Sequence, residues 1–598
     1  MNRLISILAS CDLEDITSLR RLYKENCKYS YCGIDIICSE TYRDTPECVR
    51  FTLHIPLELL NLPGHNSKDD IVLADFCLRE FVRQIDEISL SKYSVTGKEK
   101  YTGSIYIYHP GPQILLRNVS YIQDGALEIV LRIQFPVLMK EKHYVVSGRS
   151  SSKIVKKDLA RAIRNFIQQF DVGRYENNLV LFNRQQEIRA LLDERGYISF
   201  VANDRILPRG EGQLPLEGAV PFTSPKEDEV EIELSDGFIL KGMAIREGIN
   251  VITGGGYSGK STFLDSVLAG IYNHIQGDGR EYCITRTNSC KIVAEEGRCI
   301  SNLDISPFIT KTKTLNTEMF STQDASGSTS QAANIIEAIS FGCKTLFVDE
   351  DRTATNFMIK DARMKSLISD DPIIPFTDRI RQIYNEAKVS TMLIIGGSSE
   401  YLDIADDIYL MTNYRIANIT VKAKNIAKEK NIDNLLKGSK PHWIQKRYIY
   451  HGAMGTYIKD MNTQRIRENL EISGKTIIVG NYKFKTEKID TISTKAQLTA
   501  IAFLIRAVLI NHTPCVDIYE QMNQIYVRIS REGFGFLYTS KFPLESDMEL
   551  PNIQDVLFAL SRIQQGEWIT EMSDDDIAEA KAREKNKVFQ VVLLDNFR

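Results

Sequence analysis

The 598-residue sequence has no surplus of either charge, no CxxC pair and no long apolar run. Its 74 lysines and arginines against 78 aspartates and glutamates exclude a chain that binds polyanions with its whole surface. The 11 cysteines are odd in number and scattered, which favours reduced thiols in a cytoplasmic protein over a disulfide or zinc framework. Because no apolar stretch of roughly 18 residues lacks charge, we expect no transmembrane helix and no membrane partner.

The composition is that of an ordinary globular protein, with 43% hydrophobic and 25% charged residues. A chain of this length exceeds what one hydrophobic core supports, so we expect roughly two to four domains. The changes of pattern predict an N-terminal mixed α/β domain, a connector rich in Pro and Gly, an α/β domain with a largely parallel sheet, and an α+β C-terminal domain. The corresponding ranges are 1–205, 206–229, 230–420 and 421–598.

The strongest local signal is a glycine-rich loop that follows an expected strand at 250–253 and precedes an expected helix at 263–271. It matches GxxxxGK[ST], and its residues are Gly254, Gly255, Gly256, Tyr257, Ser258, Gly259, Lys260, Ser261 and Thr262. Such a loop binds phosphate oxygens with its backbone N–H groups. Lys260 would neutralise the β and γ phosphates and Ser261 would ligate a metal, so the motif predicts ATP and Mg²⁺ as cofactors.

A pair of acidic residues later in the sequence could complement this loop. The apolar run 346–348 ends in Asp349 and Glu350. At the end of a strand beside the loop, Asp349 would serve Mg²⁺, and Glu350 would orient or deprotonate the attacking water. The alternative is a surface acidic turn over 349–351, with no role in chemistry.

Between these two motifs, Ser326, Gly327 and Ser328 precede an apolar helical run over 332–339. Taken alone, they form an ordinary helix cap. Small hydroxyl residues and free N–H groups at a helix start also suit a γ-phosphate that approaches from another subunit. The presence of the other two motifs favours this second interpretation.

The order of these motifs resembles the ABC class of ATPases, in which two nucleotide domains enclose ATP between one P-loop and the other subunit's signature. More narrowly, GGGYSGKST, YNHIQGDGRE, DISPFI, DASGSTSQAANIIEA and IIGGSSEYLDIAD look like the family of predicted ABC-class ATPases. That family is soluble, lacks transport partners and includes a trypanosomatid member associated with mitochondrial RNA editing. The resemblance implies a P-loop NTPase fold of ABC type, a homodimer, and signature roles for Ser326, Gly327 and Ser328.

The sequence departs from transporter-type ABC proteins at several positions. Ser328 and Thr329 replace Gly and Gln of the LSGGQ signature, and Asn356 stands where an Asp is usual. Gly396-Gly397-Ser398-Ser399 occupies the place of a histidine that senses the γ-phosphate. Ser398 or Ser399 could donate a hydrogen bond instead, but neither carries charge, so we expect slow hydrolysis. Phe238 could stack on adenine, although a core position is the more common one for phenylalanine.

Two basic segments, Lys140 to Arg164 and Lys422 to Arg447, stand out from the acidic average. Each could be a solvated face, or could follow the phosphate backbone of RNA or DNA, with Trp443 and Tyr448 as possible stacking surfaces in the second. We therefore expect a homodimeric ATPase that couples closure to gripping or remodelling RNA or DNA. The alternative is an ATP-controlled scaffold or switch for protein partners, as in a regulatory or defence assembly.

Overall fold

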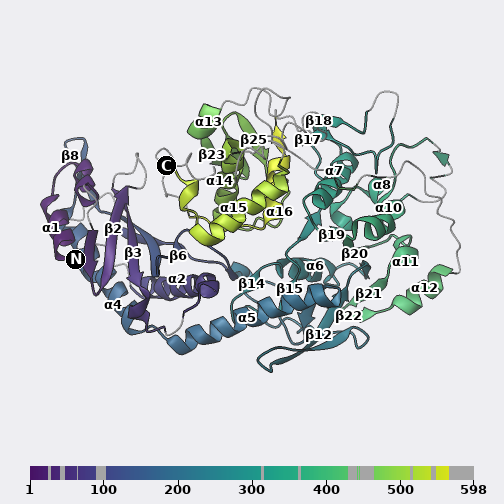
Figure 1. The fold of residues 1–598 in the computed structure, drawn as a ribbon, viewed down its shortest axis with the longest axis horizontal. Helices are drawn as coiled ribbons and strands as arrows, with labels where there is room; N and C mark the ends of the chain where they lie inside the picture. The colour runs from purple at the N-terminus through teal and green to yellow at the C-terminus, as the bar shows by residue number, and fades with distance from the viewer. Residues whose placement is uncertain are drawn as a thin grey trace, which may run out of the picture. The chain divides into compact units, whose positions relative to one another are not determined.

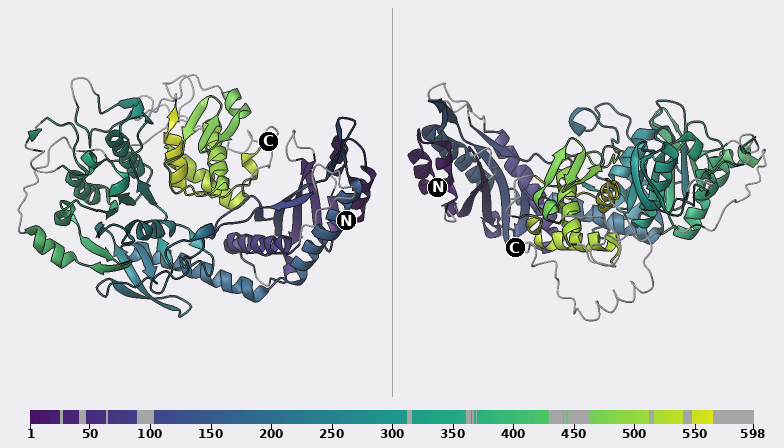
Figure 2. Two further views of the ribbon diagram at one scale, coloured as in Figure 1. Left: turned by 180° about the vertical axis from the view of Figure 1, so that it is seen from behind. Right: turned by 90° about the horizontal axis from the view of Figure 1, so that it is seen from above.

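The structure is a computed structural model of the whole chain, drawn in Figure 1 and, from behind and from above, in Figure 2. It describes residues 1–24, 28–40, 47–62, 65–88, 103–311, 316–360, 365, 367–368, 370–428, 441, 443–444, 463–511, 516–539 and 547–564.

The described chain forms two compact units. The first combines Met1–Phe182 with Arg528–Leu550, and the second contains Asn183–Val527 and the helix that follows Pro551. This grouping differs from the regions that the sequence predicts, because residues 528–550 belong with the N-terminal part of the chain.

The first unit is built on an antiparallel sheet with the order β1-β2-β3-β7-β4, to which β6 is added through β7. Alternate residues of β3, among them Phe51 and Leu53, are buried, as a sheet with one covered face requires. Helices α2 and α4 share this core, where the rings of Phe81 and Phe166 meet edge to face. The bounds are β1 Lys28–Tyr31, β2 Ile34–Glu40, β3 Cys48–Pro56, β4 Ser104–Ile107, β6 Ser120–Gln123, β7 Ala126–Gln134, α1 Asn2–Ser10, α2 Asp70–Asp86 and α4 Ala160–Gln168.

A buried arginine explains why the distant segment 528–550 joins this unit. Arg117 pairs with Asp75 on α2 and, through Nε at 2.8 Å, with Glu549 Oε1. A guanidinium buried without both partners would carry a large desolvation cost. The return of Glu549 to the first unit is therefore part of its core and not a surface contact.

The second unit is built on a six-stranded sheet with the order β16-β19-β20-β13-β21-β22, in which only β22 is antiparallel to its neighbour. All residues of β19 and β20 are buried, which matches the apolar runs of a parallel sheet covered on both faces. The chain therefore has the P-loop α/β fold that its sequence predicts. The bounds are β13 Ile249–Thr253, β16 Ser289–Ile292, β19 Thr345–Asp349, β20 Ser390–Ile394, β21 Asp407–Thr412, β22 Arg415–Asn418, α6 Lys260–Ala269 and α7 Gly327–Ser340.

Smaller sheets flank this core. The order β11-β12-β10-β15 includes the hairpin that the sequence predicts from residue 230 onward, and β17 pairs with β18. The C-terminal part contributes the antiparallel order β23-β24-β25-β26 together with α14 and α16. The bounds are α5 Val172–Arg195, β10 Tyr197–Ala202, β11 Glu229–Glu233, β12 Ile239–Arg246, β15 Cys283–Thr285, β17 Arg298–Leu303, β18 Phe320–Ala325, β23 Leu470–Ser473, β24 Thr476–Val479, β25 Tyr482–Lys485, α14 Lys495–Asn511, α15 Ile518–Glu532, α16 Ile553–Ser561 and β26 Ile563–Gln564.

Buried hydrogen bonds and ion pairs connect helix α16 and the residue after it to helix α7 and its surroundings. Ser561 Oγ donates to Glu337 Oε2 at 3.0 Å, and Arg562 pairs with Glu295 at 2.6 Å. Arg298 pairs with the same Glu337. Since each of these charges is buried with a partner, α16 holds the position of α7, whose first turn carries the predicted signature.

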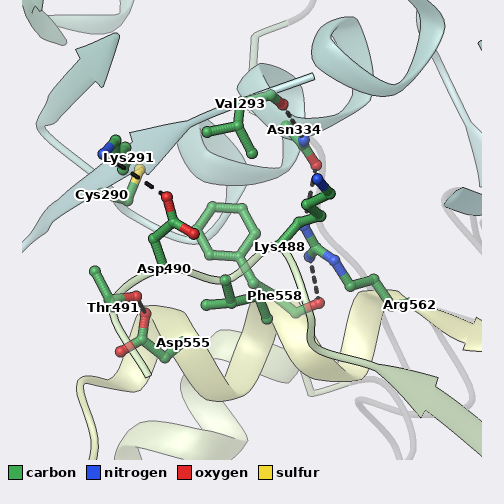
Figure 3. Close-up of a pocket in the computed structure, with 11 residues that line it drawn as sticks. Cys290, Lys291, Val293, Asn334, Lys488, Asp490, Thr491, Asp555, Phe558 and Arg562 are labelled. Atoms are coloured by element: carbon green, nitrogen blue, oxygen red, sulfur yellow. Dashed lines mark hydrogen bonds and ion pairs between the residues drawn. The ribbon is translucent and has the colours of Figure 1, made fainter. Parts of the chain in front are cut away.

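A small pocket beside these contacts is lined in part by a buried carboxyl group, that of Asp555 (Figure 3). Asp555 at the start of α16 accepts a hydrogen bond from Thr491, and its second oxygen has no hydrogen-bond partner among the described residues. Burial raises the pKa of Asp555 to about 7, although the Thr491 hydroxyl and the Arg562 charge act in the opposite direction. The folded chain therefore keeps a proton on Asp555 that the unfolded chain loses near its ordinary pKa of 3.8.

This difference predicts a pH dependence of stability. Between about pH 4 and pH 7 the folded state binds the extra proton, so the free energy of unfolding falls as pH rises, by up to roughly 4 kcal/mol, and levels off above. In Asp555→Asn this contribution should vanish, leaving the variant more stable than the parent at pH 8. Thermal or denaturant unfolding from pH 5 to pH 8 measures the free energy of unfolding of both proteins. Glu520→Gln, at an exposed position, is the control. Equal slopes for the parent and Asp555→Asn would contradict the assignment.

Candidate functional site

Three loops meet at the carboxyl edge of the parallel sheet because three adjacent strands end there. Strand β20 lies between β19 and β13, with Ile394 opposite both Asp349 and Ile252. The segments that follow these strands are the glycine-rich loop after β13, Glu350 after β19 and Gly396 after β20. Parallel strands place the residues after them on one edge of a sheet, which is where ligands bind in open α/β folds.

The glycine-rich loop has the backbone conformation that its glycines allow. Gly254 has φ +150°, and a Cβ there would lie 2.2 Å from the carbonyl oxygen of Met411. Gly259 has φ +101° immediately before α6 begins at Lys260. Tyr257, at φ +56°, projects a fully exposed ring away from the fold. Side chains larger than hydrogen would therefore prevent this turn at Gly254 and strain it at Gly259.

Lys260 lies inside the loop that precedes it. Its ammonium Nζ donates to the carbonyl oxygens of Gly254 at 2.7 Å and Gly255 at 2.9 Å. These contacts hold the positive charge within the ring of backbone that the motif predicts for phosphate. The next residue, Ser261, donates from Oγ to Asp349 Oδ2 at 2.9 Å. The structure thus brings together the lysine, the serine and the carboxylate that the sequence analysis names separately.

Glu350 lies beside them and is held by the loop after β20. Its Oε2 accepts hydrogen bonds from the N–H groups of Gly396 and, at 3.4 Å, Gly397, while its Oε1 accepts one from the hydroxyl of Ser398. The Ser398 side chain is buried. From the sequence we expect Ser398 or Ser399 to face a phosphate, whereas in the structure Ser398 donates to Glu350.

The predicted signature forms the start of α7. Ser326 caps the helix by accepting from the Thr329 N–H at 3.4 Å. Ser328 donates to Asn356 Oδ1 at 2.7 Å, which ties the helix start to the segment that follows Glu350. Within the described chain, no hydrogen bond joins 326–328 to the loop 254–262. The predicted residues therefore fall into two groups, one around Lys260 and one around the tip of α7.

A pocket of about 440 Å³ adjoins the first group. Its wall comes largely from the Pro- and Gly-rich connector, residues 206–229. Phe222 stacks on Phe263 of α6, with ring centroids 5.6 Å apart, and so fixes the connector against the phosphate loop. The lining residues are Leu207, Pro208, Arg209, Leu216, Glu217, Gly218, Ala219, Val220, Phe222, Thr223, Gly259, Thr262, Phe263, Met411, Tyr414 and Ile416.

The aromatic ring of Phe238 contacts two neighbouring side chains. Tyr282 stacks against it at 5.8 Å, and the guanidinium of Arg184 lies 3.7 Å from its centroid. Phe238 is half-buried and packs against these two side chains, so neither the adenine contact nor the core position is decided, and both stay predictions. The only sequence signal for the connector pocket was the set of apolar residues between its prolines.

The first basic segment is described in full. Lys140 ends strand β8 (Val137–Lys140), and after strand β9 (His143–Val146) the chain forms helix α3 (Gly148–Lys153), one π-helical turn and α4. Exposed cations line the outer side of these turns, namely Lys153, Lys156, Lys157, Arg161 and Arg164. Arg164 donates to the Tyr31 hydroxyl.

Most of the second basic segment lies outside the described residues, including Tyr448. Its start forms α12 (Thr420–Lys428). Trp443 is buried, its Nε1 donates to Glu386 at 2.8 Å, and its ring lies edge-on to Phe308. The prediction of Trp443 as a stacking surface is therefore wrong, because the indole is buried and offers no exposed face to a base.

None of the helices in the described ranges is long and apolar enough to span a bilayer.

Comparisons with known proteins agree with this geometry. The family described as ABC_ATPase, P-loop domain, matches residues 171–447. An uncharacterized protein of Methanocaldococcus jannaschii is 31% identical over 262 residues, which are 41% of this chain and 55% of the relative. The chain thus spans about half the length of that relative.

Among solved structures, cbiO1 from Clostridium perfringens, part of an ABC transporter complex, covers 39% of this chain and 94% of its own at 14% identity and a TM-score of 0.24. An ATP-binding cassette of an ABC transporter in its ADP conformation covers 34% of this chain and 93% of its own at 12% identity and a TM-score of 0.22. Both scores are low, so the assignment relies on the family match and the motifs. On these grounds, residues 171–447 match the P-loop domain described for the ABC ATPases, and this part of the chain has a P-loop fold of that type.

Proposed function

We propose that this protein hydrolyses ATP at the carboxyl edge of its parallel sheet. The observation that carries the proposal is the contact of Ser261 with Asp349, 2.9 Å, next to a loop that already surrounds the Lys260 ammonium. Lys260 would exchange the loop carbonyls for β- and γ-phosphate oxygens. Glu350 would take a proton from a water that attacks the γ-phosphorus as the bond to ADP breaks.

The donor set fits Mg²⁺. Ser261 and Asp349 offer one hydroxyl and one carboxylate oxygen side by side, and Mg²⁺ prefers oxygen ligands of this kind and retains several waters. When bound, the ion would neutralise phosphate charge. Ser261 and Asp349 would hold it, and the loop N–H groups of 254–259 would bind the phosphates.

The connector pocket would take the nucleoside. It adjoins the loop at Gly259 and Thr262, and its wall is mainly apolar, as a base requires. A nucleotide whose phosphates occupy the loop has its base within reach of this wall. ATP, with an uncharged purine, fits such a surface.

A second copy of the chain would complete the site. The cap residue Ser326 is exposed, and the tip of α7 is not hydrogen-bonded to the loop of its own chain. The contact of Ser328 with Asn356 links this tip to the residues after Glu350. In a homodimer, the tip of each copy would bind the γ-phosphate held by the other, so that ATP closes the pair and hydrolysis opens it.

The output of this cycle would be a grip on RNA or DNA through the segment Lys140 to Arg164. The exposed side chains of Lys153, Lys156 and Lys157 lie within two turns of helix, and among the described residues no carboxylate forms an ion pair with them. Closely spaced cations without partners suit a phosphate backbone. A protein scaffold, the alternative, would not need them.

Two substitutions separate binding from hydrolysis. Lys260→Ala should abolish ATP binding or turnover, because the phosphate charge loses its partner. Glu350→Gln should retain ATP and accumulate an ATP-held dimer while turnover falls by about a hundredfold or more. Phosphate release and light scattering with Mg·ATP measure the two effects, and the exposed Lys226→Ala is the control. Full hydrolysis by Glu350→Gln would refute its role.

A bulky side chain in the pocket lined by the connector tests whether that pocket binds the nucleoside. Val220→Trp places an indole where the base would lie, so the Kd for ATP should rise roughly tenfold or more, as the loss of about 2 kcal/mol of apolar burial requires. Binding of pyrophosphate, which has no base, should be unchanged. Val421→Trp, on the exposed face of α12, is the matched control. Parallel losses for ATP and pyrophosphate would place the nucleoside elsewhere.

The salt dependence of oligonucleotide binding distinguishes a grip on RNA or DNA from a protein scaffold. Binding of a single-stranded oligonucleotide should weaken steeply with salt, and neutralising Lys153, Lys156 and Lys157 to Gln should lower the slope of log K against log salt by up to about 2. The control replaces three other exposed lysines, Lys226, Lys344 and Lys388, with Gln. Gel shifts with RNA and DNA, with and without ATP, measure the affinity and its dependence on salt. Binding that is absent or independent of these lysines would favour the protein scaffold.

A further inference from the structure

The loop after β20 has the features of an anion site. Two consecutive N–H groups, of Gly396 and Gly397, and the hydroxyl of Ser398 point at one place. Consecutive N–H groups of this kind form nests that bind anions. We call these three donors the cradle. Its present occupant is not a ligand but the carboxylate of Glu350, which comes from the neighbouring strand.

The position of the cradle suits a second anion. It follows β20, the strand between β13, which leads into the phosphate loop, and β19, which leads into Glu350. The terminal phosphate of a nucleotide in that loop would therefore approach the same donors. A carboxylate and a phosphate cannot share three donors, because two anions so close together repel each other.

We propose that Glu350 and the γ-phosphate of ATP occupy the cradle in turn. With Glu350 in it, both carboxylate oxygens accept hydrogen bonds from the cradle, and these bonds hold the carboxylate in place. When the γ-phosphate takes the donors, Glu350 is released and can accept the proton of the attacking water. Ser398 is then a positioning residue that acts through Glu350. The inference rests on the proposed ATP hydrolysis and adds how it is triggered.

The exchange makes a graded prediction for binding. Glu350→Ala empties the cradle, whereas Glu350→Gln keeps a neutral occupant that can still accept from Gly396. A non-hydrolysable ATP analogue should bind tightest to Glu350→Ala, less tightly to Glu350→Gln and weakest to the parent, with about tenfold between the extremes. ADP, which has no γ-phosphate, should bind all three alike. Simple removal of a negative charge would instead make the Ala and Gln variants equal.

Ser398 supplies the second arm of the experiment. In the Glu350→Ala background, Ser398→Ala should weaken the ATP analogue by roughly fivefold or more and leave ADP unchanged, and Ser398→Thr should restore binding. Asp351→Asn, which removes an exposed neighbouring charge outside the cradle, is the control. Calorimetry with Mg²⁺ and each nucleotide measures all of these affinities.

The outcomes separate the two proposals. Equal affinity of the Ala and Gln variants for the analogue, or equal effects of Ser398→Ala on the analogue and ADP, would overturn the cradle exchange while ATP binding stands. If the parent binds neither nucleotide and Lys260→Ala changes nothing, the proposed ATPase function itself fails.

Discussion

The candidate site depends on the adjacency of three parallel strands. Because β20 separates β13 from β19, the loop that follows it lies between the glycine-rich loop and Glu350, and a single edge collects a cation, a hydroxyl, two carboxylates and an anion cradle. The fully buried apolar residues of β19 and β20 fix this register. A shift by one residue would turn Asp349 away from Ser261 and separate Glu350 from Gly396. Packing within the sheet therefore sets the chemistry at its edge.

The sequence predicts the parts of this site that are encoded locally. Gly254, Gly259 and Lys260 form a loop whose shape depends on its own backbone, so nine consecutive residues suffice to recognise it. An apolar run that ends in Asp349 and Glu350 likewise needs only its own pattern. For the same reason the helix cap at Ser326 could be located from its own residues.

Contacts between distant residues could not be read in this way. The hydrogen bond from Ser398 to Glu350 depends on strand order, which local periodicity does not reveal. Arg117 and Glu549 are far apart in the sequence, and a buried pair of this kind has no local signature, so the return of 528–550 to the first unit was not foreseen. Trp443 was misjudged because an indole can lie on a surface or in a core, and only its partners Phe308 and Glu386 decide.

The neutrality of the cradle gives the departure from transporter-type ABC proteins a physical meaning. The N–H groups of Gly396 and Gly397 and the Ser398 hydroxyl carry no net charge, whereas a histidine in that place could become a cation. Neutral donors add hydrogen bonds but no net charge, so they discriminate between a carboxylate and a phosphate less than a cation would. A permanent cation would favour the more highly charged phosphate and retain it. The proposed exchange between Glu350 and the γ-phosphate would therefore be reversible.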